Sequence, residues 1–526
     1  MSLSKMNKNS ILEGTISLTI ATLLVKILGA IYKIPISHIL GEEGMGYFNS
    51  AYTVYSFFYL MCTAGVPKAI MIICGDSENI ESKNYVVQVS ARFFAIIGIV
   101  LSLIFSLFSP TLSKIIGSPL ADKSMISIAP SIFFAAVSGV YRGYFSYNVK
   151  FSHIAISQII EGSVKLIFGL LLAVMSSTKY MPIYIISSYT ISGATFGSIF
   201  GLAYLWIVYK HNNSRINLKQ TNLIDQYKII KDIIKISFPI AVSAMVMSIT
   251  NIIDLSIIMN CLQSIGFSKN QSTALYGNYT TYATPIFNMV LSLFVPITIS
   301  YMPVLIKEKK SIDDFIRLLN DEINTSFFIF VPLIFGLCVY SEEILLILFE
   351  NGGVFLGSKL LVYLSVSFVF LIPLTILNCG LEAIGKVNYT MISILVGSLF
   401  KVAFGYFMIG SAVFGIYGAP LSTIISYMIS FVVSLLIAHK ENIVPNLFKP
   451  FALPLINSFI SIYAIYPIYV VLSRKVPIIC FIISVISTMI LYVLLNFAEG
   501  KLKNIKCKFP RKATTNDISK NVFTMK

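Results

Sequence analysis

Apolar runs of about twenty residues alternate with short polar segments along the whole chain, and a helix of that length crosses the hydrocarbon core of a bilayer. The pattern predicts an all-α polytopic membrane protein with about fourteen transmembrane helices. The run that follows Lys5 and Lys8 is too long for a signal-peptide core, so we expect it to be retained as the first span. The expected spans are 11–34, 48–74, 88–109, 124–148, 154–176, 183–209, 236–260, 277–306, 321–340, 359–383, 388–410, 415–438, 451–472 and 476–497.

The composition agrees with this class and argues against several others. The chain has 526 residues, of which 56% are hydrophobic and 12% charged, and its mean hydropathy is +0.83. Its seven cysteines lie mostly in apolar runs without a CxxC pair, so we expect neither a disulfide framework nor a metal site. The loops are too short for a soluble catalytic domain, and no GxxxxGK[ST] motif is present. We therefore expect a transporter rather than an enzyme, with no cofactor.

The positive charge is distributed unevenly along the chain. The net charge is +16, and most of the 39 lysine and arginine residues lie in the N-terminus, in alternate loops and in the tail after Lys501. Cytoplasmic loops of membrane proteins carry such an excess, so the distribution predicts an even number of spans with both termini in the cytoplasm. The same charges should attract anionic membrane lipids, and they do not indicate a nucleic-acid partner.

The two halves of the chain resemble each other weakly. The segment from Lys150 aligns without gaps to the segment from Lys386, and this alignment pairs Lys165 with Lys401; an earlier match pairs Gly46 with Gly277. Such a repeat predicts two pseudo-symmetric six-helix lobes in parallel orientation. The expected division is 1–209 for the N-lobe, 210–235 for an amphipathic cytoplasmic linker, 236–440 for the C-lobe, 451–497 for spans 13 and 14, and 498–526 for a basic cytoplasmic tail.

Ionisable residues inside the expected spans are the candidates for function. A lysine at the centre of a lone transmembrane helix costs roughly 2.5–3.5 kcal/mol, so such residues usually face a cavity or a partner. Basic residues outnumber acidic ones in the spans, and a net-positive cavity binds anionic oxygens by charge-assisted hydrogen bonds. Asp254 is the candidate for ion coupling. The expected substrate-binding residues are Lys26, Lys33, Arg142, Lys165 and Lys401. Further ionisable residues inside the expected spans are Lys68, Arg92, Glu161 and Glu382.

Structural alternatives stay open for most of these residues. Lys33 precedes Pro35 near the end of a span, where its side chain can extend to the lipid headgroups. Glu161 and Lys165 are four residues apart in the order that favours an ion pair on one helix. Asp254 can pair with Lys401, bind a coupling cation or exchange a proton. The sequence does not decide between these roles.

Two segments carry a family resemblance: LVKILGAIYKIPISHILGEEGMGYFNSAYTVYSFFYLMCTAGVPKAI from Leu24, and YRGYFSYNVKFSHIAISQIIE from Tyr141. They resemble the stage V sporulation protein B and polysaccharide-biosynthesis branch of the multidrug/oligosaccharidyl-lipid/polysaccharide (MOP) flippase superfamily. The resemblance implies two six-helix lobes around a central cavity, with two further helices. It also implies flipping of an undecaprenyl-pyrophosphate-linked saccharide across the bacterial cytoplasmic membrane, in the service of cell-wall, spore-cortex or polysaccharide biosynthesis.

The resemblance also bears on single residues. Lys26 and Lys33 fall at the positions of basic residues in the first helix of the family. Related lipid II flippases carry arginines in the second and eighth helices. This sequence has no arginine in its second span, 48–74, and Thr280 stands where the arginine of the eighth helix would align. Asp254 matches an acidic residue of sodium-binding relatives, but Lys401 lies about where an oxygen ligand is expected. The coupling ion, sodium or proton, therefore stays open.

Three other functions compete with the flippase. A cation-coupled multidrug exporter of the same superfamily should have an acidic or apolar cavity, and the basic surplus argues against it. A membrane glycan polymerase or ligase should carry catalytic groups in an outside loop, for which only the short segment 341–359 is available. A non-transporting sporulation scaffold is the third. The sequence does not determine the oligomeric state and is compatible with a monomer.

Overall fold

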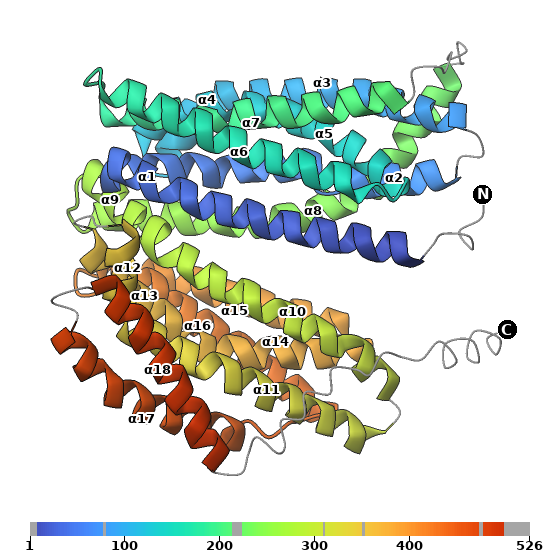
Figure 1. Cartoon of the computed structure of the whole chain (residues 1–526). Helices are drawn as coiled ribbons and strands as arrows, with labels where there is room; N and C mark the ends of the chain where they lie inside the picture. Colours follow the sequence, from blue (N-terminus) through green and yellow to red (C-terminus); the bar gives the residue numbers. More distant parts are fainter. Residues whose placement is uncertain are drawn as a thin grey trace. The chain divides into compact units, whose positions relative to one another are not determined.

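The computed structural model describes residues 8–76, 80–212, 223–308, 311–349, 353–472 and 477–498, and their regular structure is entirely helical (Figure 1). Eleven helical segments within these residues are long and apolar enough to cross a membrane. The all-α class is therefore confirmed for the described part of the chain. The count of about fourteen spans and the sidedness of the termini stay predictions.

Helix α1 (Lys8–Thr63) contains the first expected span and the start of the second. The polar segment between these spans, expected as a connection, is helical except at Gly41, whose φ of 60° and ψ of −169° interrupt the helix. Only glycine adopts this conformation readily. After a short break, α2 (Val66–Asp76) completes the second span. The connection is therefore a kink at Gly41 between two helical segments, and directly after it Glu42 accepts a hydrogen bond from Asn278 on a neighbouring helix.

Helix α8 (Leu223–Ser264) is 42 residues long and joins the second part of the expected linker to the seventh expected span. Residues 213–222 of that linker lie outside the described part. Helix α9 (Lys269–Asn278) begins at a capping box in which Ser268 and Gln271 bond to each other's backbone amides. It continues into a π-helical turn, η3 (Tyr279–Ala283), and then into α10 (Thr284–Glu308). Turns of this kind are rare and often mark functional sites.

The other helices follow the expected spans with shifted boundaries. They are α3 (Ile80–Ile115), α4 (Asp122–Ile128), α5 (Pro130–Tyr147), α6 (Phe151–Ser177), α7 (Ile183–Asn212), α11 (Ile312–Val339), α12 (Ser341–Phe349), α13 (Val354–Val366), α14 (Phe368–Ala383), α15 (Val387–Ile409), α16 (Gly418–Lys440), α17 (Phe448–Leu472) and α18 (Pro477–Ala498), with short 3-10 turns η2 (Pro119–Ala121) and η4 (Gly415–Tyr417).

The described residues pack into two compact units. The first contains the residues up to Val290 together with Ile344–Ser367 and Ile394–Ser430. The second contains Leu291–Glu343, Phe368–Ser393 and the residues from Phe431 onward. Each unit combines segments from distant parts of the chain. The lobes, linker and tail expected from the sequence stay predictions.

Within the first unit, a row of glycines on α7 lets α6 approach closely. Gly193, Gly197 and Gly201 recur every four residues, and a Cβ on Gly193 or Gly197 would overlap backbone atoms of α6. Small residues with this spacing are common where membrane helices pack. The backbone of α6 at Glu161 and Lys165 is thereby fixed against α7.

Also in the first unit, α1 and α9 cross at two glycines in a reciprocal way. A Cβ on Gly46 of α1 would overlap the carbonyl oxygen of Thr273, and a Cβ on Gly277 of α9 would overlap the carbonyl oxygen of Glu42. Gly46 therefore lies against the backbone one turn before Gly277, and Gly277 lies against the backbone one turn before Gly46. These two glycines are the ones that the sequence alignment pairs.

Candidate functional site

The charged residues of the first unit fall into paired and unpaired sets. Arg142 on α5 and Glu161 on α6 form an ion pair, with Nη2 and Oε2 2.7 Å apart and side chains 16% and 28% exposed. The Ser198 hydroxyl donates to the other oxygen of Glu161 at 3.5 Å. Glu161 thus pairs with Arg142, and the expected alternative of a Glu161–Lys165 pair on one helix is wrong.

Lys33 on α1 and Lys165 on α6 form the unpaired set; within the described residues neither has an ion pair with a carboxylate. Lys33 donates to the carbonyl oxygen of Thr280 in η3 at 3.4 Å. The Lys165 ammonium lies 4.8 Å from the ring centroid of Tyr52 and 5.7 Å from that of Tyr32. The two ammonium groups are close enough to repel each other electrostatically. We refer to Lys33 and Lys165 as the lysine pair.

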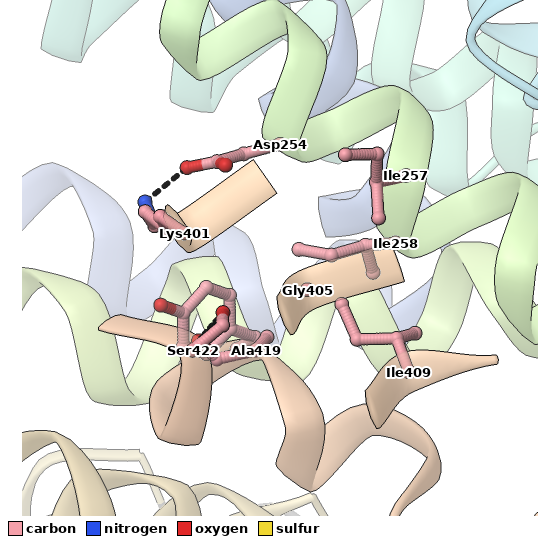
Figure 2. A pocket seen from close by; sticks show the side chains of 9 residues that line it. Asp254, Ile257, Ile258, Lys401, Gly405, Ile409, Ala419 and Ser422 are labelled. Carbon is pink, nitrogen blue, oxygen red and sulfur yellow. Dashed lines mark hydrogen bonds and ion pairs between the residues drawn. The ribbon is translucent and has the colours of Figure 1, made fainter. Parts of the chain in front are cut away.

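A second cluster surrounds a pocket in the same unit (Figure 2). Figure 2 shows Lys401 of α15 and Asp254 of α8 pointing toward each other, and the two form an ion pair with side chains 23% and 21% exposed. The pairing of these residues, one of the three roles considered for Asp254, is confirmed. The pocket is lined by Asp254, Ile257, Ile258, Tyr279, Lys401, Gly405, Ile409, Ala419 and Ser422.

The π-helical turn η3 connects the two clusters. Its first residue, Tyr279, lines the pocket beside Lys401, and the carbonyl of its second residue, Thr280, accepts from Lys33. Thr280 stands at the position where the family resemblance implies an arginine. Here the segment contributes a backbone oxygen that holds a lysine from α1. The turn therefore lies beside two lysines, Lys33 of α1 and Lys401 of α15, and Lys165 of α6 lies near Lys33.

The remaining candidates lie elsewhere or outside the description. Lys26 belongs to α1, but its side chain lies outside the described part of the chain. Lys68 and Arg92 are exposed, as expected for side chains near span ends. No group of three or more His, Cys, Asp or Glu side chains in the described residues is arranged to hold a metal ion.

One buried acid escaped the sequence reasoning. Glu322 of α11, in the second unit, is 0% exposed and has no hydrogen-bond partner in the described residues. Glu322 follows the polar residues Asn320 and Asp321, so the sequence pattern places it at the end of a polar loop. The signal that reveals it is helical spacing: it stands in register with the buried residues Leu319 and Ser326.

Comparison with known proteins agrees with this architecture. The family described as polysaccharide biosynthesis protein matches residues 11–308. Stage V sporulation protein B of Bacillus subtilis (strain 168) is 22% identical over 436 residues, covering 80% of this chain and 82% of that protein. Lipid II flippase MurJ of the same organism is 22% identical over 449 residues, covering 80% and 81%.

Solved structures show the same fold. A lipid II flippase MurJ in an inward closed conformation superposes with a TM-score of 0.70 at 20% identity, covering 92% of this chain and 99% of that one. An inward-facing multidrug resistance MATE family transporter of the MOP superfamily gives 0.61 at 15% identity, covering 81% and 98%. With its many apolar helices, the protein is a multi-pass protein of the cytoplasmic membrane. Since the family match spans more than half of its length, the chain belongs to the polysaccharide biosynthesis protein family.

Proposed function

We propose that the protein flips an undecaprenyl-pyrophosphate-linked saccharide across the cytoplasmic membrane by alternating access. The observation that carries the proposal is the lysine pair, two partly buried ammonium groups without a carboxylate partner in the described residues. A pyrophosphate presents several anionic oxygens, and it would relieve the repulsion between Lys33 and Lys165 while satisfying their donors. The rings of Tyr32 and Tyr52 beside Lys165 offer a surface for a sugar.

The other expected binding residues take secondary roles in this proposal. Arg142 and Lys401 already have carboxylate partners, so each must exchange a carboxylate for the substrate before binding it. Lys26 is assigned to the same cavity from its place in the sequence, seven residues before Lys33. The lipid-linked headgroup would enter between the predicted lobes while the polyprenyl chain stays in the lipid, and energy would come from a sodium or proton gradient, the membrane potential or the substrate gradient.

The named relatives support transport over catalysis, and the charge of the lysine pair supports an anionic headgroup over cationic drugs. MurJ of Bacillus subtilis is a lipid II flippase, and the MATE structures are multidrug transporters of the same fold. Cationic drugs would be repelled by the lysine pair, whereas an anionic headgroup is attracted. The saccharide, and its place in cell-wall, spore-cortex or polysaccharide synthesis, is set by the enzymes that make the lipid-linked precursor.

The test is binding of purified full-length protein to undecaprenyl-pyrophosphate saccharides and to a cationic dye, measured for wild type, Lys33→Ala, Lys165→Ala and Lys165→Arg. We expect saccharide binding by the wild type, at least a tenfold loss in each alanine variant, and retention in Lys165→Arg. A tenfold loss corresponds to about 1.4 kcal/mol, just below the roughly 1.5–3 kcal/mol of a hydrogen bond to a charged group, so the expected loss is tenfold or more.

Lys123→Ala is the matched control. Lys123 is half-exposed and pairs only loosely with its neighbour Asp122 at 3.7 Å, so its removal should leave binding unchanged. Dye binding without saccharide binding would reassign the protein to drug export. Saccharide binding that survives in both alanine variants would show that the lysine pair is not the binding site.

A further inference from the structure

Helix α11 of the second unit buries one acidic side chain in its apolar stripe. The buried positions recur at intervals of three and four residues, and Glu322 falls between Leu319 and Ser326 on this face. The Glu322 side chain is 0% exposed. A carboxyl group therefore occupies a place that helical periodicity reserves for an apolar residue.

The polar atoms around Glu322 are unsatisfied as well. Neither carboxyl oxygen has a hydrogen-bond partner in the described residues, and the same holds for the buried hydroxyls of Ser326, one turn further along α11, and of Thr298 on α10. Buried polar atoms nearly always find a partner, so four unpaired oxygens in one unit require an explanation.

Contacts of a third helix place these groups near one another. The Cys379 thiol of α14 donates to the carbonyl oxygen of Thr298 at 3.6 Å and interacts electrostatically with Glu322. A Cβ on the adjacent Gly380 would lie 3.2 Å from Leu319, one turn before Glu322. Helices α10, α11 and α14 thus meet at this carboxyl group.

The charged and titratable neighbours offer Glu322 no counter-ion. From α14, Glu382 adds a second acid near the same thiol. From α10, the Tyr301 hydroxyl lies 3.5 Å from the hydroxyl of Thr325. Helix α18 contributes Tyr492, which donates to the carbonyl of Phe328, and α17 contributes the ring of Phe451. Among the described residues, no lysine, arginine or histidine forms an ion pair with Glu322.

An ionised carboxylate without partners in such a place is destabilised by several kcal/mol, whereas a neutral carboxyl group can donate its one proton to a neighbouring hydroxyl. We propose that Glu322 is a proton-binding site of the second unit. It holds a proton while α10, α11 and α14 are packed together, and it releases that proton to water when their packing opens. The carboxyl oxygen gains or loses one proton, and no other bond changes.

This site is separate from the Asp254–Lys401 pair and supplies a coupling group of a different kind. Asp254 is neutralised by an ammonium group of the protein itself, so it has no need of a proton. Glu322 has no such cation among the described residues. The proton site does not depend on the identity of the cargo, and its first test needs no substrate.

The test is infrared spectroscopy of the full-length protein in lipid nanodiscs at neutral pH. We expect a carbonyl band of a protonated carboxylic acid that shifts in heavy water and is lost in Glu322→Gln. Glu382→Gln is the matched control, because Glu382 lies on the neighbouring helix and accepts from the Thr390 hydroxyl at 3.4 Å. It should keep the band. If Glu322→Gln fails to fold, Ser326→Ala serves instead, and the band should persist at a shifted frequency because the hydroxyl one turn from the carboxyl group is removed.

Absence of the band in the wild type, or its persistence in Glu322→Gln, would overturn the proposal. Loss of the band when choline is exchanged for sodium would assign the site to a metal ion instead. A second experiment rests on the proposed function: flipping of undecaprenyl-pyrophosphate saccharide in proteoliposomes should respond to a pH gradient in the wild type and in Glu382→Gln, and not in Glu322→Gln. If no saccharide moves at all, the proposed function fails while the infrared result stands.

Discussion

At the scale of single residues, what separates the cations of the first unit is whether an acid already neutralises them. Arg142 and Lys401 each have a carboxylate from another helix, while Lys33 and Lys165 have only a carbonyl oxygen and aromatic rings. Breaking a partly buried ion pair leaves one charge uncompensated and costs more than the pair itself contributes. The paired residues should therefore act on stability, and the lysine pair on binding.

Glu161→Gln should lower the free energy of unfolding by about 1–3 kcal/mol, because it leaves the Arg142 guanidinium largely buried without a counter-charge. The measurement is thermal unfolding of the purified protein. Removing both charges in Arg142→Gln/Glu161→Gln should recover part of the loss. Lys123 is the control: its side chain is 52% exposed and its ammonium group lies 3.7 Å from Asp122, so Lys123→Gln should cost less than about 0.5 kcal/mol. Equal effects for Glu161→Gln and Lys123→Gln would contradict the assignment.

Lys401→Ala should make stability depend on sodium. In the wild type the ammonium group neutralises Asp254, whereas in the variant the carboxylate faces a partly buried pocket with no cation of its own. Sodium chloride should then raise the midpoint of thermal unfolding by about 2 °C or more relative to choline chloride. The double variant Lys401→Ala/Asp254→Asn should lose this response. A sodium response of the same size in the wild type would show that the lysine does not replace the ion.

Helical spacing can suggest an ion pair only when both partners lie on the same helix. Helical spacing suggested Glu161 with Lys165, yet Glu161 bonds to Arg142 of another helix, which spacing along α6 cannot reveal. The pairing of Asp254 with Lys401 was foreseeable, because an acid inside a membrane needs a partner. Glu322 was missed because its polar sequence neighbours placed it at a loop boundary.

At the scale of elements, the apolar runs predicted the helices well and their ends poorly. The connection between the first two spans is reduced to a kink at Gly41, and α8 includes part of the expected linker. Run length does not show which polar groups find partners in the fold, as Glu42 does with Asn278. Nor does it indicate the π-helical turn η3, whose carbonyl oxygen holds Lys33. The crossing of α1 and α9, by contrast, lies at the two glycines that the sequence alignment pairs.

Gly46→Ala and Gly277→Ala should each destabilise the protein by about 1–3 kcal/mol, because the added methyl group overlaps a backbone carbonyl of the opposite helix. The two effects should be similar, since the contact is reciprocal, and thermal unfolding measures both. Gly336→Ala is the control: no atom lies within 4 Å of its added Cβ, so helix propensity should make it neutral or stabilising by about 0.5–1 kcal/mol. If all three variants behave alike, the crossing does not depend on glycine.

At the scale of the whole molecule, the sequence predicted the helical membrane class and the family, but the compact units combine distant segments. The second unit contains parts of α10, α15 and α16 together with the last two helices. A repeat alignment divides the chain into consecutive segments of similar sequence, whereas the compact units group the segments that contact one another. The expected lobes and the observed units therefore need not coincide. What the charges predict at this scale is the side of the membrane on which each loop lies.

Cysteines placed at lysine positions in the loops should therefore fall into two classes by their reaction with a membrane-impermeant maleimide. Single cysteines replacing Lys179 or Lys269, both exposed and expected outside, should react in intact cells, whereas those replacing Lys150 or Lys228, both exposed and expected inside, should react only after permeabilisation. The background carries serine in place of Cys338, Cys480 and Cys507, and the remaining native cysteines, Cys62, Cys74, Cys261 and Cys379, are buried. Labelling of all four positions in intact cells, or a reversed pattern, would contradict the cytoplasmic location of the termini. The expected pattern requires an even number of crossings between the N-terminus and Lys150, and again between Lys150 and Lys228, which the expected spans provide.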